Sequence, residues 1–205
     1  MQEQLTFFLF NKQFYSKSIK KEDNNMEEKI NRAHEFAIAA HGDQERKFTG
    51  ATYTSHIEET AQLVWEVTDG KAETDDYIAA ILHDVVEDTD VSLNEVGRHF
   101  GKVVMDLVEE LTIDPIQKKL EGKKPYLSKK MNTMSSRALT IKLCDRLSNV
   151  VGLEYEVIPK DFVKWYVKET AYLLDNLTRS LNDDQEYLIN RIRKMLMYLV
   201  ISRKL

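Results

Sequence analysis

The chain has 205 residues, of which 42% are apolar, and its formal net charge is −5. This length suits one domain with or without an appendage, and the apolar fraction is ample for a hydrophobic core. The acidic balance and the lack of a basic tract argue against DNA or RNA as a partner. A small anionic ligand is still compatible with a local basic pocket.

Cysteine use and hydropathy indicate the compartment. The single cysteine, Cys144, excludes an intrachain disulfide and fits a reducing environment. No apolar run is long enough to cross a membrane, and the short apolar stretch at 5–10 lacks the features of a secretory signal. We therefore expect a cytoplasmic protein without membrane association. The sequence carries no signal of its oligomeric state.

The chain divides into two unequal parts. Residues 1–25 are polar over much of their length and show no helical period, so we interpret them as an N-terminal extension, either flexible or upstream of a second start at Met26. Residues 26–205 contain few prolines and glycines and no sustained strand alternation. We expect them to form a single compact all-α domain.

Periodicity and capping signals predict the helices in chain order. The first helix begins near Glu27 and stops at Gly42. After a loop, Ser55 and Glu58 form a capping-box pattern for a helix over 56–67, and Ser92 with Glu95 form another. The lysine-rich segment 114–125 is expected to be a connection. The other predicted helices cover 74–88, 92–101, 102–112, 128–154, 161–181 and 183–203.

The stretch ILHDVVEDTD, residues 81–90, is unusually acidic for one side of a helix. No Lys or Arg occurs between Lys71 and Arg98, so these carboxylates have no local ion-pair partner. Neighbouring carboxylates repel one another unless a cation or shifted protonation relieves them. The alternative is an ordinary amphipathic helix. On a helical wheel the polar face carries His83, Asp84, Glu87 and Asp88.

A metal bound by His83 and Asp84 needs further ligands. His56 lies at the start of the preceding predicted helix, and Asp145 lies beside an apolar seam, where a carboxylate is costly to bury unless it is paired or bound to a metal. Two imidazoles and two carboxylates suit Mn²⁺ or Fe²⁺, and Zn²⁺ is also compatible. The alternatives are a solvent-facing His56 and an ion pair between Asp145 and Lys142 or Arg146.

The order H…HD…D, together with AHGDQERKFTGATYTSH, AAILHDVVEDTDVSLNEVGRHFG, LVEELT and IKLCDRLSNV, resembles the hydrolase domain of RelA/SpoT proteins. The likeness is greatest to the stand-alone small alarmone hydrolases and covers about residues 27–155, and more loosely to about 200. It implies an HD-domain helical bundle that hydrolyses ppGpp and pppGpp to GDP or GTP and pyrophosphate, with Mn²⁺. Only about fifty helical residues follow residue 155, so we expect hydrolysis without a synthetase domain.

The resemblance also implies roles for individual residues. The metal ligands would be His56, His83, Asp84 and Asp145. The catalytic pair would be Glu87, as the proton acceptor, and Asp88, which positions the water or Glu87. The substrate-binding residues would be Arg46 and Lys47 near the purine, with Tyr53, Thr112, Lys142 and Asn149. For His34 and His41 we expect packing or helix-end roles.

Departures from the family pattern leave the substrate open. Ser148 stands where relatives commonly have His, and the segment GATYTSHI lacks the Glu-Pro after its Gly and the Pro after His56 that relatives commonly have. The alternatives are an adenosine alarmone, an NADPH phosphatase activity, and a catalytically silent nucleotide-binding regulatory module. We also hypothesise that the lysine-rich segment 118–130 reaches over the site, in which case alanine at Lys123 and Lys124 should raise KM.

Overall fold

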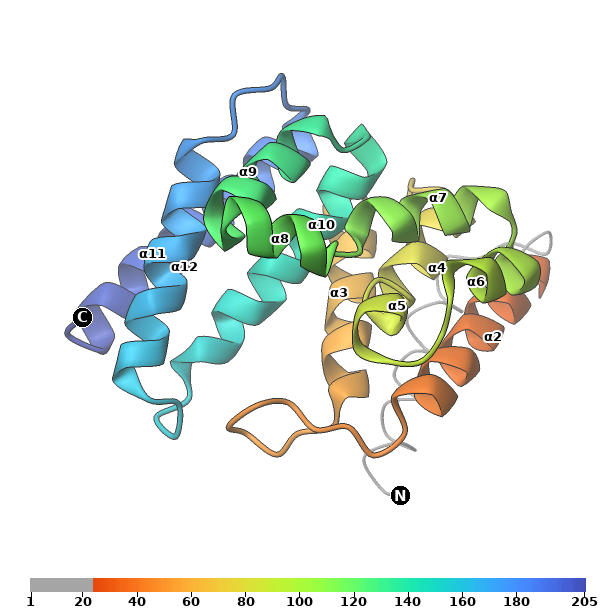
Figure 1. Ribbon diagram of the computed structural model, residues 1–205, viewed down its shortest axis with the longest axis horizontal. Helices are drawn as coiled ribbons and strands as arrows, with labels where there is room; N and C mark the ends of the chain where they lie inside the picture. Colours follow the sequence, from red (N-terminus) through yellow and green to blue (C-terminus); the bar gives the residue numbers. More distant parts are fainter. Residues whose placement is uncertain (1–23) are drawn as a thin grey trace.

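The computed structural model describes residues 24–205, and these residues form helices joined by turns and loops (Figure 1). Within this range the only β contact is an isolated bridge between Glu45 and Thr52. The all-α prediction is therefore confirmed. The elements are α2 (Asn24–His41), α3 (Tyr53–Val67), α4 (Thr74–Ile81), α5 (Val85–Asp88), α6 (Leu93–Phe100), α7 (Lys102–Leu111), α8 (Pro115–Glu121), α9 (Lys123–Thr133), α10 (Ser136–Val151), η1 (Gly152–Glu154), α11 (Lys160–Asp175) and α12 (Asp183–Ser202).

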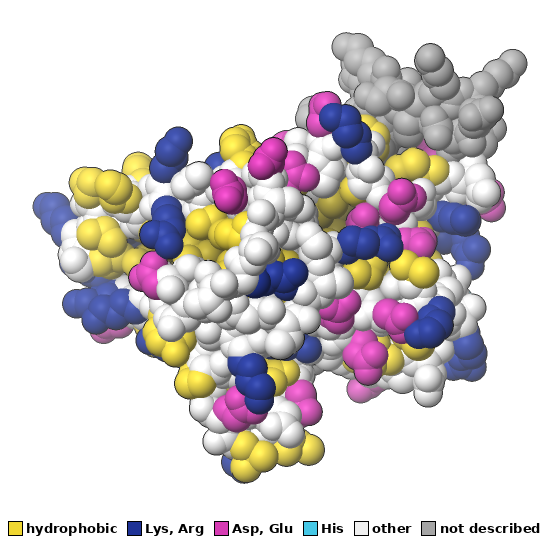
Figure 2. Space-filling view, turned by 90° about the horizontal axis from the view of Figure 1, so that it is seen from above, with side chains coloured by type: hydrophobic (Ala, Val, Ile, Leu, Met, Phe, Trp, Pro, Cys, Tyr) yellow, Lys and Arg dark blue, Asp and Glu magenta, His cyan; other side chains and the backbone are white. Residues whose placement is uncertain are grey.

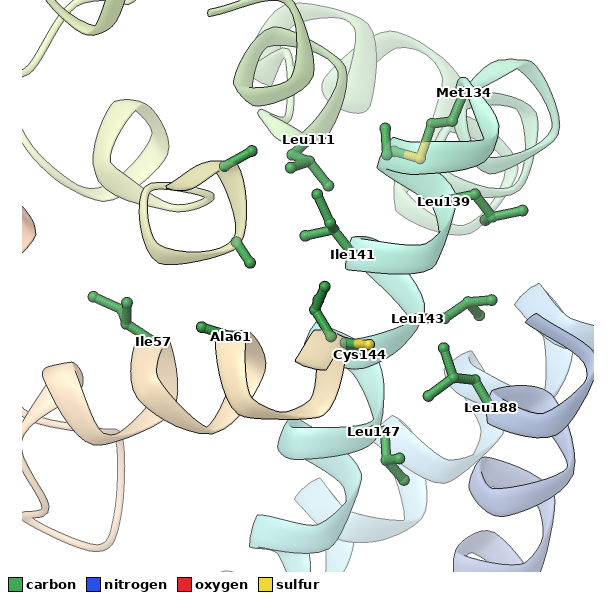
Figure 3. Packing of buried hydrophobic residues seen from close by; sticks show 14 of the residues in the cluster. Ile57, Ala61, Leu111, Met134, Leu139, Ile141, Leu143, Cys144, Leu147 and Leu188 are labelled. Atoms are coloured by element: carbon green, nitrogen blue, oxygen red, sulfur yellow. The ribbon is translucent and has the colours of Figure 1, made fainter. Parts of the chain in front are cut away.

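Helix α10 is the central element of the domain. It packs against α3, α4 and α7 on one side and against α11 and α12 on the other. In Figure 3, Cys144 lies where α10 meets α3, whereas Leu143 lies on the other side of α10, beside Leu188 of α12. Burying a leucine side chain completely stabilises the fold by about 1.5–3 kcal/mol. Because α10 is apolar on both sides, its polar residue Asp145 is carried into the interior.

Two predicted helix ends are confirmed, and a third is wrong. Gly42 follows the last residue of α2 and has a φ of 53°, a conformation that favours glycine. Ser92 and Glu95 form the expected capping box at the start of α6. The box predicted from Ser55 and Glu58 is wrong. Helix α3 begins earlier, with Thr52 as its N-cap, and the Ser55 hydroxyl donates to the Thr52 carbonyl at 2.8 Å instead.

The continuous helix predicted over 74–88 is also wrong. Helix α4 ends at Ile81, and His83 and Asp84 lie in the turn before α5. The His83 ring explains the break, because its Nδ1 lies 2.7 Å from the Ala80 carbonyl oxygen. In an unbroken helix that oxygen would accept from the backbone N–H of Asp84. The conformation of this turn therefore determines the directions of the His83 and Asp84 side chains. The helical wheel does not describe them, because the two residues lie outside a regular helix.

Three predicted boundaries need smaller corrections. The helix predicted over 128–154 is divided between α9 and α10, because Ser135 caps α10 by accepting from the backbone N–H of Ala138. The lysine-rich connection is helical, forming α8 and the first turn of α9. Helix α11 ends at Asp175, short of 181. The predicted extension 1–25 lies outside the described residues, except for Asn24 and Asn25, which belong to α2.

The surface mixes charges of both signs. On the face shown in Figure 2, Lys and Arg side chains alternate with Asp and Glu, and hydrophobic side chains lie between them. Among residues 24–205, no helix has the length and apolarity needed to span a bilayer.

Candidate metal centre and active site

The four residues predicted as metal ligands converge from three elements: α3, the α4–α5 turn and α10. His56 Nε2 lies 3.2 Å from Asp145 Oδ1, and His83 Nε2 lies 2.9 Å from Asp84 Oδ2. The cross distances, from His56 Nε2 to Asp84 Oδ2 and from His83 Nε2 to Asp145 Oδ1, are both 3.8 Å. The donor atoms of His56, His83 and Asp84 all lie within 4.8 Å of one another. Residues up to 89 positions apart in the sequence thus face a common point.

The donor set fits a divalent cation. His83 Nδ1 faces the Ala80 carbonyl oxygen, which can only accept, so Nδ1 carries a proton and Nε2 is the nitrogen directed toward the cluster. His83 is 1% exposed, and among the described residues its Nε2 has no hydrogen-bond partner of acceptable geometry. Buried polar atoms are rarely left unpaired, so this nitrogen indicates a ligand position.

The electrostatics of the cluster also favour a cation. Burial lowers the pKa of His83, but the Asp84 and Asp145 carboxylates outweigh burial and raise it to about 9. The pKa of Asp84 is lowered because His83 outweighs the effect of burial, and the pKa of Asp145 is lowered chiefly by Lys142 and His56. The carboxylates thus hold a proton on the imidazole, and a divalent cation would displace it.

Asp145 is held by residues of its own helix. Its Oδ2 lies 2.8 Å from Lys142 Nζ, and its Oδ1 accepts from Asn149 Nδ2 at 2.6 Å. The ion pair considered as an alternative to metal binding therefore exists, but it uses one oxygen and leaves the other facing His56. Lys142 is buried against Asp145. Its contact with a substrate phosphate stays a prediction.

Tyr53 connects a proposed ligand with the proposed catalytic pair. Its hydroxyl oxygen lies 2.5 Å from Asp84 Oδ2 and 3.0 Å from Asp88 Oδ2. Burial, followed by the charge of Asp84, raises the pKa of Tyr53, so the hydroxyl stays protonated and donates. Its ring stacks on His41, with the ring centroids 4.7 Å apart. His41 ends α2 and bonds Gln44, so it has the helix-end role expected for it.

Glu87 is fixed by the chain beyond α7. Its Oε2 accepts from the backbone N–H of Ile113 at 3.2 Å. Burial raises the pKa of Glu87, with Lys142 opposing and Asp84 adding to the shift, and a higher pKa makes the carboxylate a better proton acceptor near neutral pH. Thr112 precedes Ile113, but its hydroxyl donates to the Val108 carbonyl. The described contacts do not bring Thr112 to the cluster.

A cavity of about 1300 Å³ adjoins the cluster, and His56 and Tyr53 form part of its wall. Arg46 and Lys47 also line it. The Arg46 guanidinium lies 3.3 Å from Glu59 Oε2 and donates to Asn149 Oδ1 at 3.3 Å. The ammonium group of Lys47 lies 5.0 Å and 5.3 Å from the ring centroids of Phe48 and Phe162. The loop predicted to meet the purine therefore borders a space large enough for a nucleotide.

The sequence interpretation missed two residues of this site, Glu59 and Ser148. Glu59 follows His56 by three residues in α3, and Ser148 follows Asp145 by three in α10. Residues three apart lie on the same side of a helix, so this spacing was the available signal. In the sequence, Ser148 is marked only by its departure from the family pattern.

This helical fold, with two histidines and two aspartates facing one point, defines an HD-domain protein. The profile of the HD domain family matches residues 33–169. The guanosine-3′,5′-bis(diphosphate) 3′-pyrophosphohydrolase MESH1 of Homo sapiens is 40% identical over 124 residues, which are 59% of this chain and 67% of that protein. The Xenopus tropicalis MESH1 is 30% identical over 163 residues, or 79% of this chain and 89% of that protein.

Two further relatives extend the comparison. The guanosine-3′,5′-bis(diphosphate) 3′-pyrophosphohydrolase of Aquifex aeolicus is 40% identical over 156 residues, which are 75% of this chain but only 22% of that longer protein. A solved structure described as "A metazoan ortholog of SpoT hydrolyzes ppGpp and plays a role in starvation responses" is 30% identical, with a TM-score of 0.70. The alignment covers 81% of this chain and 94% of that one. The chain therefore belongs to the HD-domain family, and the relatives it resembles include MESH1 proteins of similar length and a longer pyrophosphohydrolase.

Proposed function

We propose that this protein hydrolyses guanosine 3′,5′-bis(diphosphate) and its pentaphosphate at the 3′-pyrophosphate, giving GDP or GTP and pyrophosphate. The observation that carries the proposal is the convergence of His56, His83, Asp84 and Asp145, with Tyr53 linking Asp84 to Asp88. The names of the relatives state the same activity for those proteins. The buried thiol of Cys144 suits action in the reducing cytoplasm.

We assign the four converging residues as ligands of one divalent cation. Two imidazole nitrogens and carboxylate oxygens suit Mn²⁺, which we propose as the native ion, and the same donors also accept Fe²⁺ or Zn²⁺. When bound, such a cation supplies Lewis acidity, which makes water a stronger nucleophile at neutral pH. Lys142 and Asn149 hold the Asp145 carboxylate in place for this role.

The reaction adds water across the bond between the ribose O3′ and the adjacent phosphorus. A bond forms between the phosphorus and the water oxygen, and the bond between the phosphorus and O3′ breaks. O3′ ends with the proton that the water gives up. Glu87 accepts the proton of the attacking water, because its pKa is raised by burial and its carboxylate is fixed by the Ile113 N–H. Asp88, which accepts from Tyr53, orients the water or Glu87.

We place the nucleoside in the cavity bordered by the 46–59 segment. A guanidinium can stack on a purine and an ammonium can meet a phosphate, which are the roles proposed for Arg46 and Lys47. Asn149 lies between Arg46 and Asp145, so it is placed to meet the ribose or a phosphate. Thr112 is proposed as a substrate-binding residue and Lys142 as a phosphate contact on the family resemblance alone.

A nucleotide panel tests the substrate assignment. The kcat/KM values for ppGpp and pppGpp would be compared with those for the adenosine counterpart and NADPH, using one preparation loaded with Mn²⁺. We expect the two guanosine substrates to give the highest values. A higher value for an adenosine nucleotide or for NADPH would overturn the assignment, and nucleotide binding without turnover on the whole panel would make the protein a binding module.

A further inference from the structure

Glu59 lies on the wall of the cavity and belongs to neither the proposed ligands nor the catalytic pair. Its Oε2 accepts from the Ser148 hydroxyl at 2.7 Å and lies 3.3 Å from Arg46 Nη1. It therefore joins α3 to the end of α10 and to the loop that precedes α3. Ser148 in turn contacts His56, and Arg46 contacts Asn149, which contacts Asp145.

The first branch runs through Ser148 to His56. A carboxylate only accepts, so Ser148 gives its single hydroxyl proton to Glu59. The Ser148 oxygen is then left to accept from His56 Nδ1, which lies 2.9 Å away. The proton is thereby held on Nδ1, and the lone pair of Nε2 faces Asp84 and Asp145. His56 and Ser148 are 2% and 3% exposed, so water does not compete for the bond between them, whereas the Glu59 side chain is exposed at the cavity wall.

The second branch runs through Arg46 and Asn149 to Asp145. Arg46 Nη2 donates to Asn149 Oδ1, and Asn149 Nδ2 donates to the Asp145 oxygen that faces His56. The guanidinium packs closely on the chain after α10, where a Cβ at Gly152 would lie 3.1 Å from Arg46 Nη2. The charge of Glu59 helps to keep the guanidinium in this place.

We propose that Glu59 is a positioning residue of the metal centre. It fixes the ring orientation and tautomer of His56 through Ser148, and it fixes the ligating oxygen of Asp145 through Arg46 and Asn149. This inference rests on the metal centre assigned under the proposed function. Ser148 and Asn149 contact the proposed ligands directly, and the loss of such partners typically changes metal affinity by about 10- to 100-fold. Glu59 acts on the ligands through these residues.

The test is the dissociation constant for Mn²⁺ alone, measured on the full-length protein after removal of metal, from the electron paramagnetic resonance signal of free Mn²⁺. Ser148→Ala and Glu59→Leu should each raise this constant, by about tenfold or more for Ser148→Ala, which removes the direct partner of His56. Glu59→Gln keeps an oxygen that accepts from Ser148, so its constant should lie close to that of the unmodified protein. Adding Ser148→Ala to Glu59→Leu should weaken binding less than Ser148→Ala does alone, because both changes break the same branch.

Glu58→Leu is the matched control. Glu58 neighbours Glu59 in α3 and lines the same cavity, but it forms no hydrogen bond with Ser148 or Arg46, so this variant should bind Mn²⁺ as the unmodified protein does. The proposal is overturned if Glu59→Leu leaves the dissociation constant for Mn²⁺ unchanged. It is also overturned if the double variant raises this constant by the product of the two factors that the single variants show. Nucleotide is absent throughout, so neither result depends on whether ppGpp is the substrate.

Discussion

Lys142 Nζ lies 2.8 Å from Asp145 Oδ2, and both side chains are less than a tenth exposed. The same carboxylate faces His56 with its other oxygen. Asp145 therefore has two separable tasks: it neutralises a buried ammonium group, and it supplies an oxygen to the proposed metal centre. The pKa of Lys142 is raised because Asp145 and Asp84 outweigh the effect of burial, so the ammonium keeps its charge.

Asp145→Asn should disrupt both tasks. The Lys142 ammonium would stay buried without its closest countercharge, so the free energy of unfolding of the metal-free protein should fall by roughly 3 kcal/mol, as measured by urea denaturation. Mn²⁺ binding should be lost as well, as measured by elemental analysis after dialysis.

The double variant Asp145→Asn with Lys142→Met separates the two tasks. Removing the ammonium group relieves the uncompensated charge, so most of the stability should return while Mn²⁺ binding stays lost. A double variant as unstable as Asp145→Asn would show that the ion pair is not the cause. A double variant that regains Mn²⁺ binding would show that Asp145 is not a ligand.

Glu87→Gln tests the proposed proton acceptor. The amide cannot take a proton from water, so kcat for ppGpp should fall by about 10²- to 10⁴-fold, with Mn²⁺ and nucleotide binding retained. Asp90→Asn is the matched control, because Asp90 is an exposed carboxylate in the turn after α5, and it should keep normal turnover. Equal losses in the two variants would point to the local charge and would exclude a specific role for Glu87.

Glu58 should make the stability of the protein depend on pH, whether or not metal is bound. Burial, followed by the charge of Glu59, raises the pKa of Glu58 from 4.5 to about 8. The folded state therefore favours the protonated form, so the contribution of Glu58 to stability is present below pH 4.5 and is lost as the pH rises through about 8. Glu58→Gln avoids this loss. Its Tm, relative to that of the unmodified protein, should rise between pH 5 and pH 8, and a difference that does not change with pH would contradict the shift.

The sequence predicted the helical class and the residues that converge, but it did not predict how the residues are held. Periodicity finds helices, because it reports which side is buried. It cannot anticipate that the His83 ring takes the Ala80 carbonyl and ends α4, since that bond depends on the three-dimensional path of the turn. The network of Glu59 and Ser148 was missed for the same reason, because it joins two helices that the sequence separates by 89 positions.

The contacts of the lysine-rich segment 118–130 could not be predicted from the sequence either. Lys123 lies over Trp165 and pairs with the buried Glu169, and Lys124 lies over Tyr172, so both are directed toward α11. Alanine at these positions should therefore leave KM unchanged. Lys130 is directed elsewhere, because its ammonium group donates to the Glu109 carbonyl of α7 at 3.4 Å. Burial lowers the pKa of Lys130, and Lys142 and Glu87 are among the charges that influence it.

Lys130→Ala should therefore raise KM for ppGpp, by about tenfold if the ammonium group meets a phosphate, and should leave the fold intact. Lys123→Ala is the comparison variant. It removes one of the cations beside Glu169, so it should lower Tm and leave KM unchanged. Steady-state kinetics and thermal melts of both variants check this, and a higher KM for Lys123→Ala alone would reverse the assignment.

Product analysis is the most direct test of the central claim. The purified protein, loaded with Mn²⁺ and then mixed with ppGpp, would be followed by chromatography of the nucleotides and by a pyrophosphate assay. Cleavage between O3′ and phosphorus predicts GDP and pyrophosphate in equal amounts, and no turnover after the metal is removed by a chelator. Release of orthophosphate in place of pyrophosphate, or no product from protein with bound Mn²⁺, would contradict the account.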